Sequence, residues 1–487
     1  MSLAERFFEV VSKNPSAPVL IENDREISRQ ELADRASVLA AAFIAQGVTE
    51  GDFVGLSLAN NSDHLAAMLA LSRVGAASVP FNARGERAHG LARRFGIKLV
   101  CVDHGNLTDS GLISVDISKV NLVSHEELKA VSSLRWPADD LPARIGMTSG
   151  TTGEPNAILY SQAFWVERIE TTVEDCDSNT RTIVANLQLT MGNLGVFAAV
   201  LAGGVAIFSE LHNPRAFFHT VRRYGVTHAI TMPGSITTMA ALNEYNGVAF
   251  PTMKYLRVIG GAFEPALVEL AAAKLTPNVY HPYGLSEVGA ISMADLQMLR
   301  EDPEFAGVLK PGCRARVRDA DGKVLESGET GIIEVSVPGM PERYFDNEAA
   351  TKLKFNDGWF ITGDIGMVRA DGAIRIDGRS DHKINIAGRK VQPERVESAL
   401  LKHPEVVEAA VFAAELGGKR VIFGAVVPNH KGPLKLPLKR FCLRMRLGSQ
   451  APDRFVLVDK LPKNEAGKLL RRELEQQLLN WMGGARD

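Results

Sequence analysis

Cysteine is scarce in this 487-residue chain, and long apolar runs are missing. The four cysteines lie far apart and form no CxxC pair, which excludes a dense disulfide framework and favours a reduced, cytoplasmic protein. No run of about 18 apolar residues occurs, so no membrane-spanning helix is expected. The opening residues, MSLAERFFEVVSKNP, are charged and amphipathic, unlike a signal peptide.

An excess of charge of one sign and the usual metal-ligand spacings are missing too. The formal net charge is −2, so the chain as a whole lacks the electrostatic footprint of a nucleic-acid-binding protein. The 11 histidines show no HExxH or CxxC…H spacing, which excludes the common transition-metal motifs. A Walker A loop, GxxxxGK[ST], is also missing, so any phosphate-binding loop must be of another kind.

The composition that remains is that of a globular protein. Hydrophobic residues make up 45% of the chain and charged residues 23%. The length exceeds one ordinary hydrophobic core and predicts roughly two to four domains.

The first part of the chain alternates between helical and strand patterns. Residues 28–47 have a serine start, an apolar stripe and a glycine stop, which predicts a helix. Residues 62–75 predict a second helix, with Ser62 as its cap. Short apolar runs predict strands at 52–58, 77–81, 98–103, 182–186, 205–209, 226–232 and 255–259. This alternation is typical of an α/β fold with mostly parallel sheets covered by helices.

A different pattern begins near Gly307. Short strands broken by turns run through residues 310–337, and a further hairpin signal follows at 369–379. These runs indicate an antiparallel or barrel-like subdomain. The chain becomes helical again at 393–402.

This change of pattern predicts two domains. We expect a large N-terminal domain of residues 1–379, in which residues of about 307–378 form the β-rich subdomain. A small α+β C-terminal domain would then comprise residues 380–487.

Residues 147–157, MTSGTTGEPNA, would make a poor helix or strand. The two glycines permit positive φ angles and a close approach of the backbone to a ligand. Successive amides in such a turn form a concave anion site, to which hydroxyls add donors. The segment therefore predicts a phosphate-binding loop made of Thr148, Ser149, Gly150, Thr151, Thr152 and Gly153. A surface loop rich in serine, threonine and glycine is the alternative.

This segment resembles the TSGTTGxPKG phosphate loop of the acyl-adenylate-forming superfamily, the AMP-dependent synthetases and ligases. Acyl-CoA synthetases, nonribosomal adenylation domains and luciferases belong to it. Further segments resemble its other motifs in family order: LRVIGGAFEP from Leu256, HPYGLSEVG from His281, DGWFITGDIG from Asp357 and LPKNEAGKLLRREL from Leu461. The resemblance implies ATP- and Mg²⁺-dependent activation of a carboxylic acid by a large N-terminal domain and a small mobile C-terminal domain.

The resemblance also implies how the adenine is held. The small residues Gly260, Gly261 and Ala262 would border the base. Tyr283 would stack on it, a contact between two flat rings, with Gly284 beside it.

Polar residues of the same motifs would bind the rest of the nucleotide. Ser286 stands where the family usually has threonine, and its hydroxyl would bond the α-phosphate. Glu287 would hold Mg²⁺, which prefers oxygen ligands. Asp364 would accept from the ribose hydroxyls, and Arg379 would reach the ribose and phosphates.

Two residues of the C-terminal part have implied roles in catalysis. Lys468 would be the mobile catalytic lysine that bridges the carboxylate and the α-phosphate as charge builds. Asp381 would be the domain hinge. A turn about this hinge would exchange the Lys468 loop for residues 384–392 and admit a thiol.

The chain departs from the family pattern at two places. Asn156 replaces the usual lysine of the phosphate loop, and Ala157 replaces the following glycine. Met191 stands where the family often has an aromatic or histidine gate. The predicted acid pocket, which comprises Met191, Asn193 and Gly284, is therefore differently shaped or more apolar.

The leading interpretation is a CoA ligase acting on a small apolar acid, with ATP, Mg²⁺ and CoA as cofactor and co-substrates. GRKVQPERVE, from Gly388, resembles the CoA-ligase pattern. The alternatives are a stand-alone enzyme that loads an acyl or amino acid onto a carrier protein, and a degenerate nucleotide-binding protein. No nucleic-acid partner is expected, whereas an oligomer is compatible with the sequence.

A basic stretch, residues 431–446, has no acid in it. It is interpreted either as a solvated helical face or as a surface for the phosphates of CoA or for an acidic carrier.

Overall fold

A computed structural model describes the chain apart from a few segments. The undescribed residues are 82–84, 104–111, 121–122, 149–154, 173–175, 211–212, 261–262, 381–383, 387–388, 417–418, 431, 433, 463–468, 472 and 478–487. Among the described residues, no helix is both long and apolar enough to cross a membrane.

The N-terminal part contains a six-stranded sheet with the order β6-β5-β3-β4-β7-β8. Its strands are β3 (Phe53–Ser57), β4 (Ala77–Pro80), β5 (Leu99–Val102), β6 (Ile113–Asp116), β7 (Pro142–Met147) and β8 (Ala157–Ser161). All pairs are parallel except β7 with β8, which form an antiparallel hairpin. The strands predicted at 52–58, 77–81 and 98–103 are confirmed.

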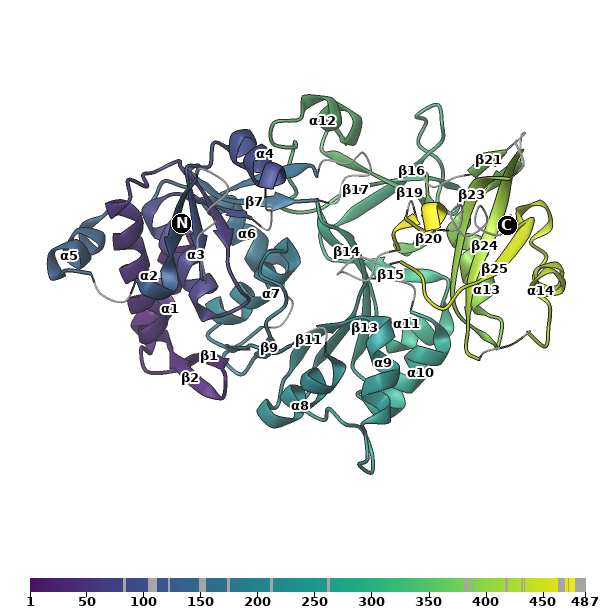
Figure 1. Cartoon of the computed structure of the whole chain (residues 1–487), viewed down its shortest axis with the longest axis horizontal. Helices are drawn as coiled ribbons and strands as arrows, with labels where there is room; N and C mark the ends of the chain where they lie inside the picture. Colours follow the sequence, from purple (N-terminus) through teal and green to yellow (C-terminus); the bar gives the residue numbers. More distant parts are fainter. Residues whose placement is uncertain are drawn as a thin grey trace, which may run out of the picture.

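Helices lie on and around this sheet, with α5 outermost (Figure 1). They are α1 (Leu3–Lys13), α2 (Arg29–Ala45), α3 (Ser62–Val74), α4 (Gly85–Phe95), η1 (Ile117–Lys119), α5 (His125–Ser133) and α6 (Gln162–Thr172). Ser28 caps α2 in a reciprocal arrangement with Glu31. The predicted cap of α3 is wrong by one residue, because Asn61 rather than Ser62 accepts from the His64 amide at 3.0 Å. The Ser62 hydroxyl instead donates to Glu22 at 2.5 Å.

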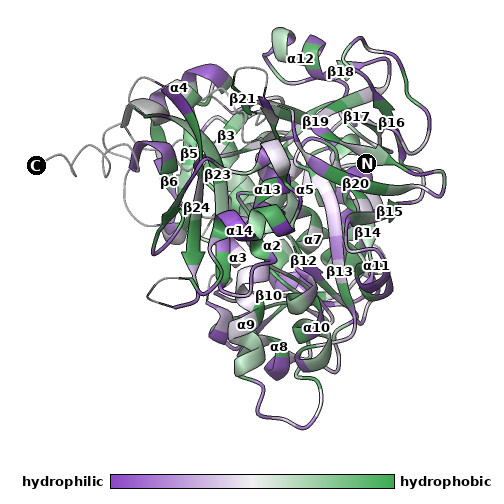
Figure 2. Cartoon of the chain, turned by 90° about the vertical axis from the view of Figure 1, so that its right-hand side faces the viewer, coloured by the Kyte–Doolittle hydropathy of each residue, from purple (hydrophilic) through white to green (hydrophobic). Residues whose placement is uncertain are grey.

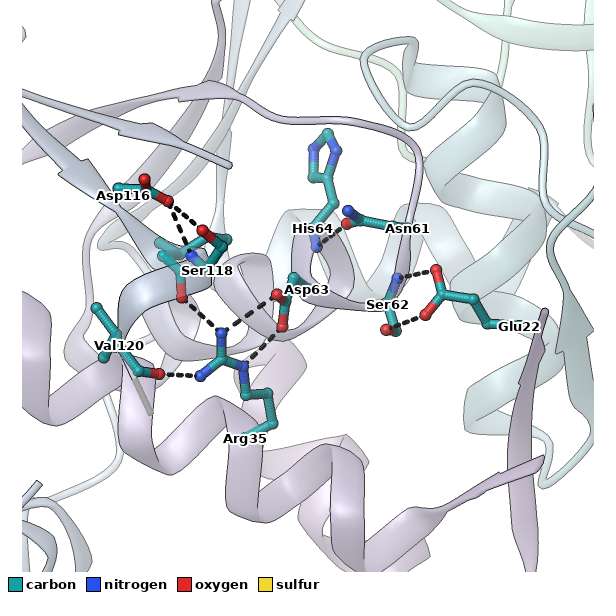
Figure 3. A network of polar contacts seen from close by, with 10 residues as sticks. Glu22, Arg35, Asn61, Ser62, Asp63, His64, Asp116, Ser118 and Val120 are labelled. Carbon is teal, nitrogen blue, oxygen red and sulfur yellow. Dashed lines mark hydrogen bonds and ion pairs between the residues drawn. The ribbon is translucent and has the colours of Figure 1, made fainter. Parts of the chain in front are cut away.

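A polar network joins α2, α3 and the segment after β6 (Figure 3). The Arg35 guanidinium donates to both carboxylate oxygens of Asp63, at 2.6 and 3.2 Å. It also donates to the carbonyls of Ile117, at 2.7 Å, and of Val120. Because one half-buried guanidinium satisfies a carboxylate and two carbonyls, these three segments are held in one arrangement.

A buried histidine on α3 predicts that the free energy of unfolding decreases as the pH falls. Burial is the main cause that lowers the pKa of His64 to about 4, and the ring contacts the Ala59 carbonyl at 3.1 Å. Since the folded-state pKa lies below the unfolded value of about 6.5, the unfolded chain binds the proton more strongly. This contribution is complete above pH 6.5 and is lost as the pH falls towards 4. Between pH 7 and 5 it removes about 2 kcal/mol of the free energy of unfolding.

The measurement is the thermal midpoint of unfolding between pH 7.5 and 5. His64→Gln is expected to flatten the pH dependence, whereas His125→Gln, at an exposed position, leaves it unchanged. Equal slopes for the His64 variant and the native chain would contradict the assignment.

The second sheet has 14 strands and runs through the centre of the molecule in the order β16-β17-β19-β20-β15-β14-β13-β12-β11-β9-β10-β1-β2, with β18 paired to β19. Its strands are β1 (Pro18–Glu22), β2 (Arg25–Ser28), β9 (Arg181–Ile183), β10 (Val205–Ile207), β11 (His228–Thr231), β12 (Tyr255–Val258), β13 (Val279–Leu285), β14 (Gly289–Ala294), β15 (Phe305–Leu309), β16 (Arg314–Arg318), β17 (Thr330–Ser336), β18 (Phe355–Asn356), β19 (Trp359–Val368) and β20 (Ala373–Arg379).

The direction of pairing changes along this sheet. The strands from β1 through β10, β9, β11 and β12 to β13 pair in parallel, and those from β13 through β14 to β20 pair antiparallel. The prediction for residues 310–337 and 369–379 is thus confirmed in its antiparallel form. The strands extend the parallel sheet and do not close into a barrel among the described residues.

Six helices accompany this sheet, namely α7 (Thr190–Leu201), α8 (Pro214–Tyr224), α9 (Pro233–Ala241), α10 (Pro265–Lys274), α11 (Leu296–Glu301) and α12 (Glu348–Lys354). Helices α8, α9 and α10 lie together beside the parallel strands (Figure 1). They enclose a core with buried residues of the sheet, among them Ile183, Leu256 and Val258.

The C-terminal part has its own small sheets and core. The strands β21 (Ile384–Ile386) and β22 (Arg389–Val391) form a hairpin, and β23 (Val406–Leu416), β24 (Lys419–Pro428) and β25 (Arg454–Leu457) form a three-stranded sheet. The helices are α13 (Pro393–Leu401), α14 (Leu438–Arg444) and η2 (Gly448–Gln450). Strand β24 is largely hydrophobic (Figure 2), and this part lies at one end of the molecule (Figure 1). The helix predicted at 393–402 is confirmed.

Candidate functional site

Three of the predicted nucleotide-binding residues lie together. The Tyr283 hydroxyl, on β13, donates to Asp364 Oδ2 at 2.5 Å, and Arg379 Nη1 donates to Asp364 Oδ1 at 3.2 Å. Strands β19 and β20 pair Asp364 with Arg379 in register, so the sheet itself sets this contact. Only the fold brings Tyr283, far away in sequence, to the same carboxylate.

Burial dominates the electrostatics of this group. Asp364 is 4% exposed, and burial raises the pKa of its carboxyl, against the opposing effects of the Tyr283 hydrogen bond and the Arg379 charge. Burial, with the Asp364 charge second, also raises the pKa of Tyr283 well above its usual value. A neutral tyrosine hydroxyl therefore remains a donor at neutral pH. The ionised carboxylate keeps lone pairs for further donors, such as the hydroxyls of a sugar.

Glu287 lies in the turn between β13 and β14. Its hydrogen-bond partner was not predicted from the sequence. The Tyr344 hydroxyl donates to Glu287 Oε1 at 3.0 Å. Tyr344 is 3% exposed, and burial followed by the Glu287 charge raises the pKa of its hydroxyl. Glu287 is half-buried, while its neighbour Ser286 is exposed. The carboxylate is thus oriented by one hydrogen bond and still accessible.

Two backbone hydrogen bonds mark the base of the predicted phosphate loop. The Thr148 amide donates to the Asn156 carbonyl at 2.9 Å. Ala157, the first residue of β8, accepts from the Phe345 amide at 2.7 Å. The loop therefore connects two paired strands, and the segment that carries Tyr344 is hydrogen-bonded to its base.

Asn156, which replaces the expected lysine, has a defined contact. Its Oδ1 accepts from Asn347 Nδ2 at 2.8 Å. Asn347 also caps α12, because its Oδ1 accepts from the Ala350 amide at 3.0 Å. Asn156 thus joins the edge of the loop to the start of α12. A lysine at residue 156 would have carried a charge there.

Several predicted residues lie outside the described residues. They are Ser149, Gly150, Thr151, Thr152, Gly153, Gly261, Ala262, Asp381 and Lys468. Their flanks are described. Gly260 has a φ of 88°, which favours glycine. At Gly284 an added Cβ would lie 2.3 Å from the Gly289 carbonyl oxygen, so close backbone packing requires glycine there.

The residues predicted for the acid pocket do not all line one cavity. Met191, in the first turn of α7, is 49% exposed and lines a small cavity. Asn193 is completely buried, and its amide donates to the carbonyls of Leu187 and Leu189, the latter at 3.1 Å. Its side chain supports the start of α7 and is not among the groups that line this cavity.

Both flanks of the undescribed residues 463–468 have defined contacts. The Leu470 amide donates to the Pro462 carbonyl at 2.9 Å, which closes the base of the loop. Arg471 forms a two-pronged ion pair with Glu397 on α13, at 2.6 and 2.8 Å. Arg471, after these residues, is thereby held against α13 and β23.

Sequence reasoning missed Tyr344, Asn347 and Arg471. Tyr344 could have been suspected because, with Phe345, it forms an aromatic pair in the otherwise hydrophilic run PERYFDN. Arg471 belongs to a motif that was recognised, but its partner Glu397 lies 74 residues away. No local signal marks Asn347, because an asparagine before a helix is explained by capping alone.

The arrangement suits a nucleotide with its metal ion. Among the described residues, no cluster of three or more histidine, cysteine, aspartate or glutamate side chains could hold a metal by itself. A single accessible carboxylate, Glu287, fits Mg²⁺, which is commonly bound by one or two carboxylates together with phosphate oxygens.

Comparison with known proteins identifies the family of this chain. The sequence model described as "AMP-binding enzyme" matches residues 7–345, and that described as "AMP-binding enzyme C-terminal domain" matches residues 395–468. The chain is 26% identical over 484 residues to a 2-succinylbenzoate–CoA ligase of Bacillus subtilis (strain 168), covering 95% of each chain. It is also 26% identical to a fatty acid–[acyl-carrier-protein] ligase of Streptomyces coeruleorubidus, over 97% of this chain and 95% of the relative.

A solved structure has the same fold. O-succinylbenzoate coenzyme A synthetase from Bacillus subtilis, in complex with ATP and a magnesium ion, superposes with a TM-score of 0.84 at 24% identity. The match covers 96% of this chain and 98% of that one. The expected architecture, a mixed α/β fold with a large N-terminal and a small C-terminal domain, is confirmed.

Proposed function

Because this chain belongs to the AMP-binding enzyme family, we propose that it activates a small carboxylic acid with ATP and transfers the acyl group to the thiol of CoA. The observation that carries the proposal is the pairing of Tyr283, Asp364 and Arg379 beside an accessible Glu287. CoA ligases among the relatives support the choice of thiol.

The first step joins two anions, so their electrostatic repulsion must be offset. The carboxylate attacks the α-phosphorus of ATP, so that an acyl-AMP forms and pyrophosphate leaves. The amides and hydroxyls of residues 148–153 would hold the phosphates, with the Ser286 hydroxyl on the α-phosphate. Glu287 would hold Mg²⁺, which neutralises phosphate charge when bound. Lys468 would bridge the reacting carboxylate and the α-phosphate.

The nucleoside would be held by the described residues. Asp364 would accept from the ribose hydroxyls, and Arg379 would orient that carboxylate and reach the phosphates. Tyr283 would stack on the adenine, with its ring direction set by its bond to Asp364. The turn at Gly260, Gly261 and Ala262 would border the base.

The second step needs a thiol in place of the lysine. The thiol sulfur attacks the acyl carbon, its proton is released, and AMP leaves. We place the domain boundary at residues 379–380, and a rotation about Asp381 would remove the Lys468 loop and bring in residues 384–392. This exchange would let one site serve both half-reactions.

A carrier protein is the second candidate acceptor, and one surface favours it. Exposed basic side chains cover α14 and its flanks: Lys435, Lys439, Arg440, Arg444 and Arg446. Leu443, which is 75% exposed, lies among them. A basic surface with an apolar centre is complementary to an acidic helix of a carrier.

The test is a pyrophosphate-release screen over fatty, aryl and amino acids, with and without CoA. Acid-dependent release, followed by acyl-CoA formation when CoA is present, is the expected result. If the acyl group passes only to an acidic carrier, and the Lys439→Glu/Arg440→Glu double variant abolishes this transfer, the carrier is the acceptor. Silence with every acid would refute the activation chemistry and favour the degenerate alternative.

A further inference from the structure

A small cavity lies between the start of α7 and the sheet, beside the predicted position of the acid. Its volume is about 20 Å³, room for at least one water-sized group. Strands β9, β11 and β12 contribute its floor and α7 its wall. It is lined by Thr182, Met191, Gly195, Val196, Ile230 and Arg257, among others.

Arg257, on β12, gives this cavity a positive charge. It is half-buried, and its guanidinium carbon lies 5.5 Å from the centre of the Tyr255 ring. None of the residues that line the cavity is acidic, and no ion pair joins Arg257 to a carboxylate in the part of the chain that the structure describes. A half-buried guanidinium that lines a cavity can bind an anion through charge-assisted hydrogen bonds.

The first two turns of α7 form the opposite wall of the cavity. The helix has 12 residues, and Leu189 at its cap provides no side-chain hydrogen bond. Met191 and Gly192, in its first turn, line the cavity. The amides of a first helical turn have no partner within the helix, and the helix dipole favours an anion there. Gly195 and Val196, one turn further along, line the cavity as well, so it borders the side of α7, and Arg257 is the feature that favours a negative charge there.

The sheet sets the separation between this cavity and the nucleotide residues. Arg257 is the register partner of Tyr280 on the neighbouring strand β13. Tyr283 lies three residues further along β13, which at a rise of about 3.3 Å per residue is on the order of 10 Å. Along the sheet the cavity is therefore displaced by about 10 Å from the level of the nucleotide residues, a distance that a short acid can span.

We propose that the cavity receives a second anionic group of the acid substrate, at the end remote from the carboxylate that is activated. The substrate would then be a dianionic acid, such as a dicarboxylic acid, rather than the apolar acid expected from Met191. This inference rests on the proposed function and names its substrate class.

The test compares matched acids in ATP–pyrophosphate exchange. Linear dicarboxylic acids of increasing chain length are each paired with the monocarboxylic acid of the same carbon number. The native chain is expected to have a higher kcat/KM for the dicarboxylic member of the best pair. Arg257→Met is expected to lower that value about 100-fold, as for a lost charge-assisted hydrogen bond, and to spare the monocarboxylic acid. Arg257→Lys keeps the charge and is expected to retain part of the preference.

Arg215→Met, at an exposed position on α8, is the matched control and leaves both acids unchanged. Exchange with the monocarboxylic acid shows that the Arg257 variants are folded. If the native chain prefers the monocarboxylic member of every pair, or if Arg257→Met lowers both members equally, the inference is overturned and the proposed function stands. If no acid of any class supports exchange, both are overturned.

Discussion

Replacement of Asp364 by asparagine is expected to weaken nucleotide binding about 100-fold, because two charge-assisted hydrogen bonds to the ribose are lost, together worth about 3 kcal/mol. The substitution keeps the size of the side chain and removes its charge. It also removes the ion pair that Arg379 makes with this carboxylate at 3.2 Å. The measurement is the dissociation constant of ATP by calorimetry, together with the KM for ATP in pyrophosphate exchange.

A second ligand makes this test specific to the ribose. The native chain is expected to bind 2′,3′-dideoxy-ATP much more weakly than ATP, and Asp364→Asn should remove most of that difference. Asp377→Asn is the matched control, since Asp377 lies on β20 and pairs with Arg375 at 2.9 Å. If Asp364→Asn weakened both nucleotides equally, the residue would act on the fold of the site and not on the ribose.

Replacement of Lys468 by alanine is expected to lower acid-dependent ATP–pyrophosphate exchange by about 1000-fold, the upper range for loss of one preorganised donor to a developing charge. Thioester formation from premade acyl-AMP should be nearly unaffected, because the lysine would have left the site before that step. The two half-reactions are measured separately, with the same preparation.

Lys460→Ala provides the control for this loop. Lys460 is exposed and lies in the same C-terminal segment, before the loop that the Leu470 amide closes onto Pro462. It should leave both half-reactions intact. Equal loss of adenylation and thioester formation in Lys468→Ala would mean that the residue stabilises the domain and has no separate part in the first step.

The alternation of short apolar runs with amphipathic helices was sufficient to predict the α/β class. Residues 255–259 predicted a strand and β12 is that strand, because the apolar pattern of a buried strand can be recognised from residues adjacent in sequence. Local signals failed at the cap of α3, where Asn61 and Ser62 are both suitable residues. Only the competing bond of Ser62 to Glu22, 40 residues away, separates them.

In the site, too, local patterns predicted some features and the fold decided others. The order of the motifs along the chain indicated the family and named Tyr283, Asp364 and Arg379, yet it contained nothing about their contacts. Their meeting depends on the register of β19 with β20 and on the position of β13 in the sheet. Tyr344 was absent from the prediction because its partner Glu287 is 57 residues away.

By itself, therefore, the sequence determined the class of fold, the family and the kind of chemistry, since these depend on local patterns and on motifs in a set order. Tertiary structure alone decided which groups face one another. It places Tyr344 beside Glu287 and brings Asn156 into contact with the start of α12. It also places Arg257 and the start of α7 around one cavity. The physical reason is that strand register and helix packing, which no local pattern encodes, set the distances over which hydrogen bonds and charges act.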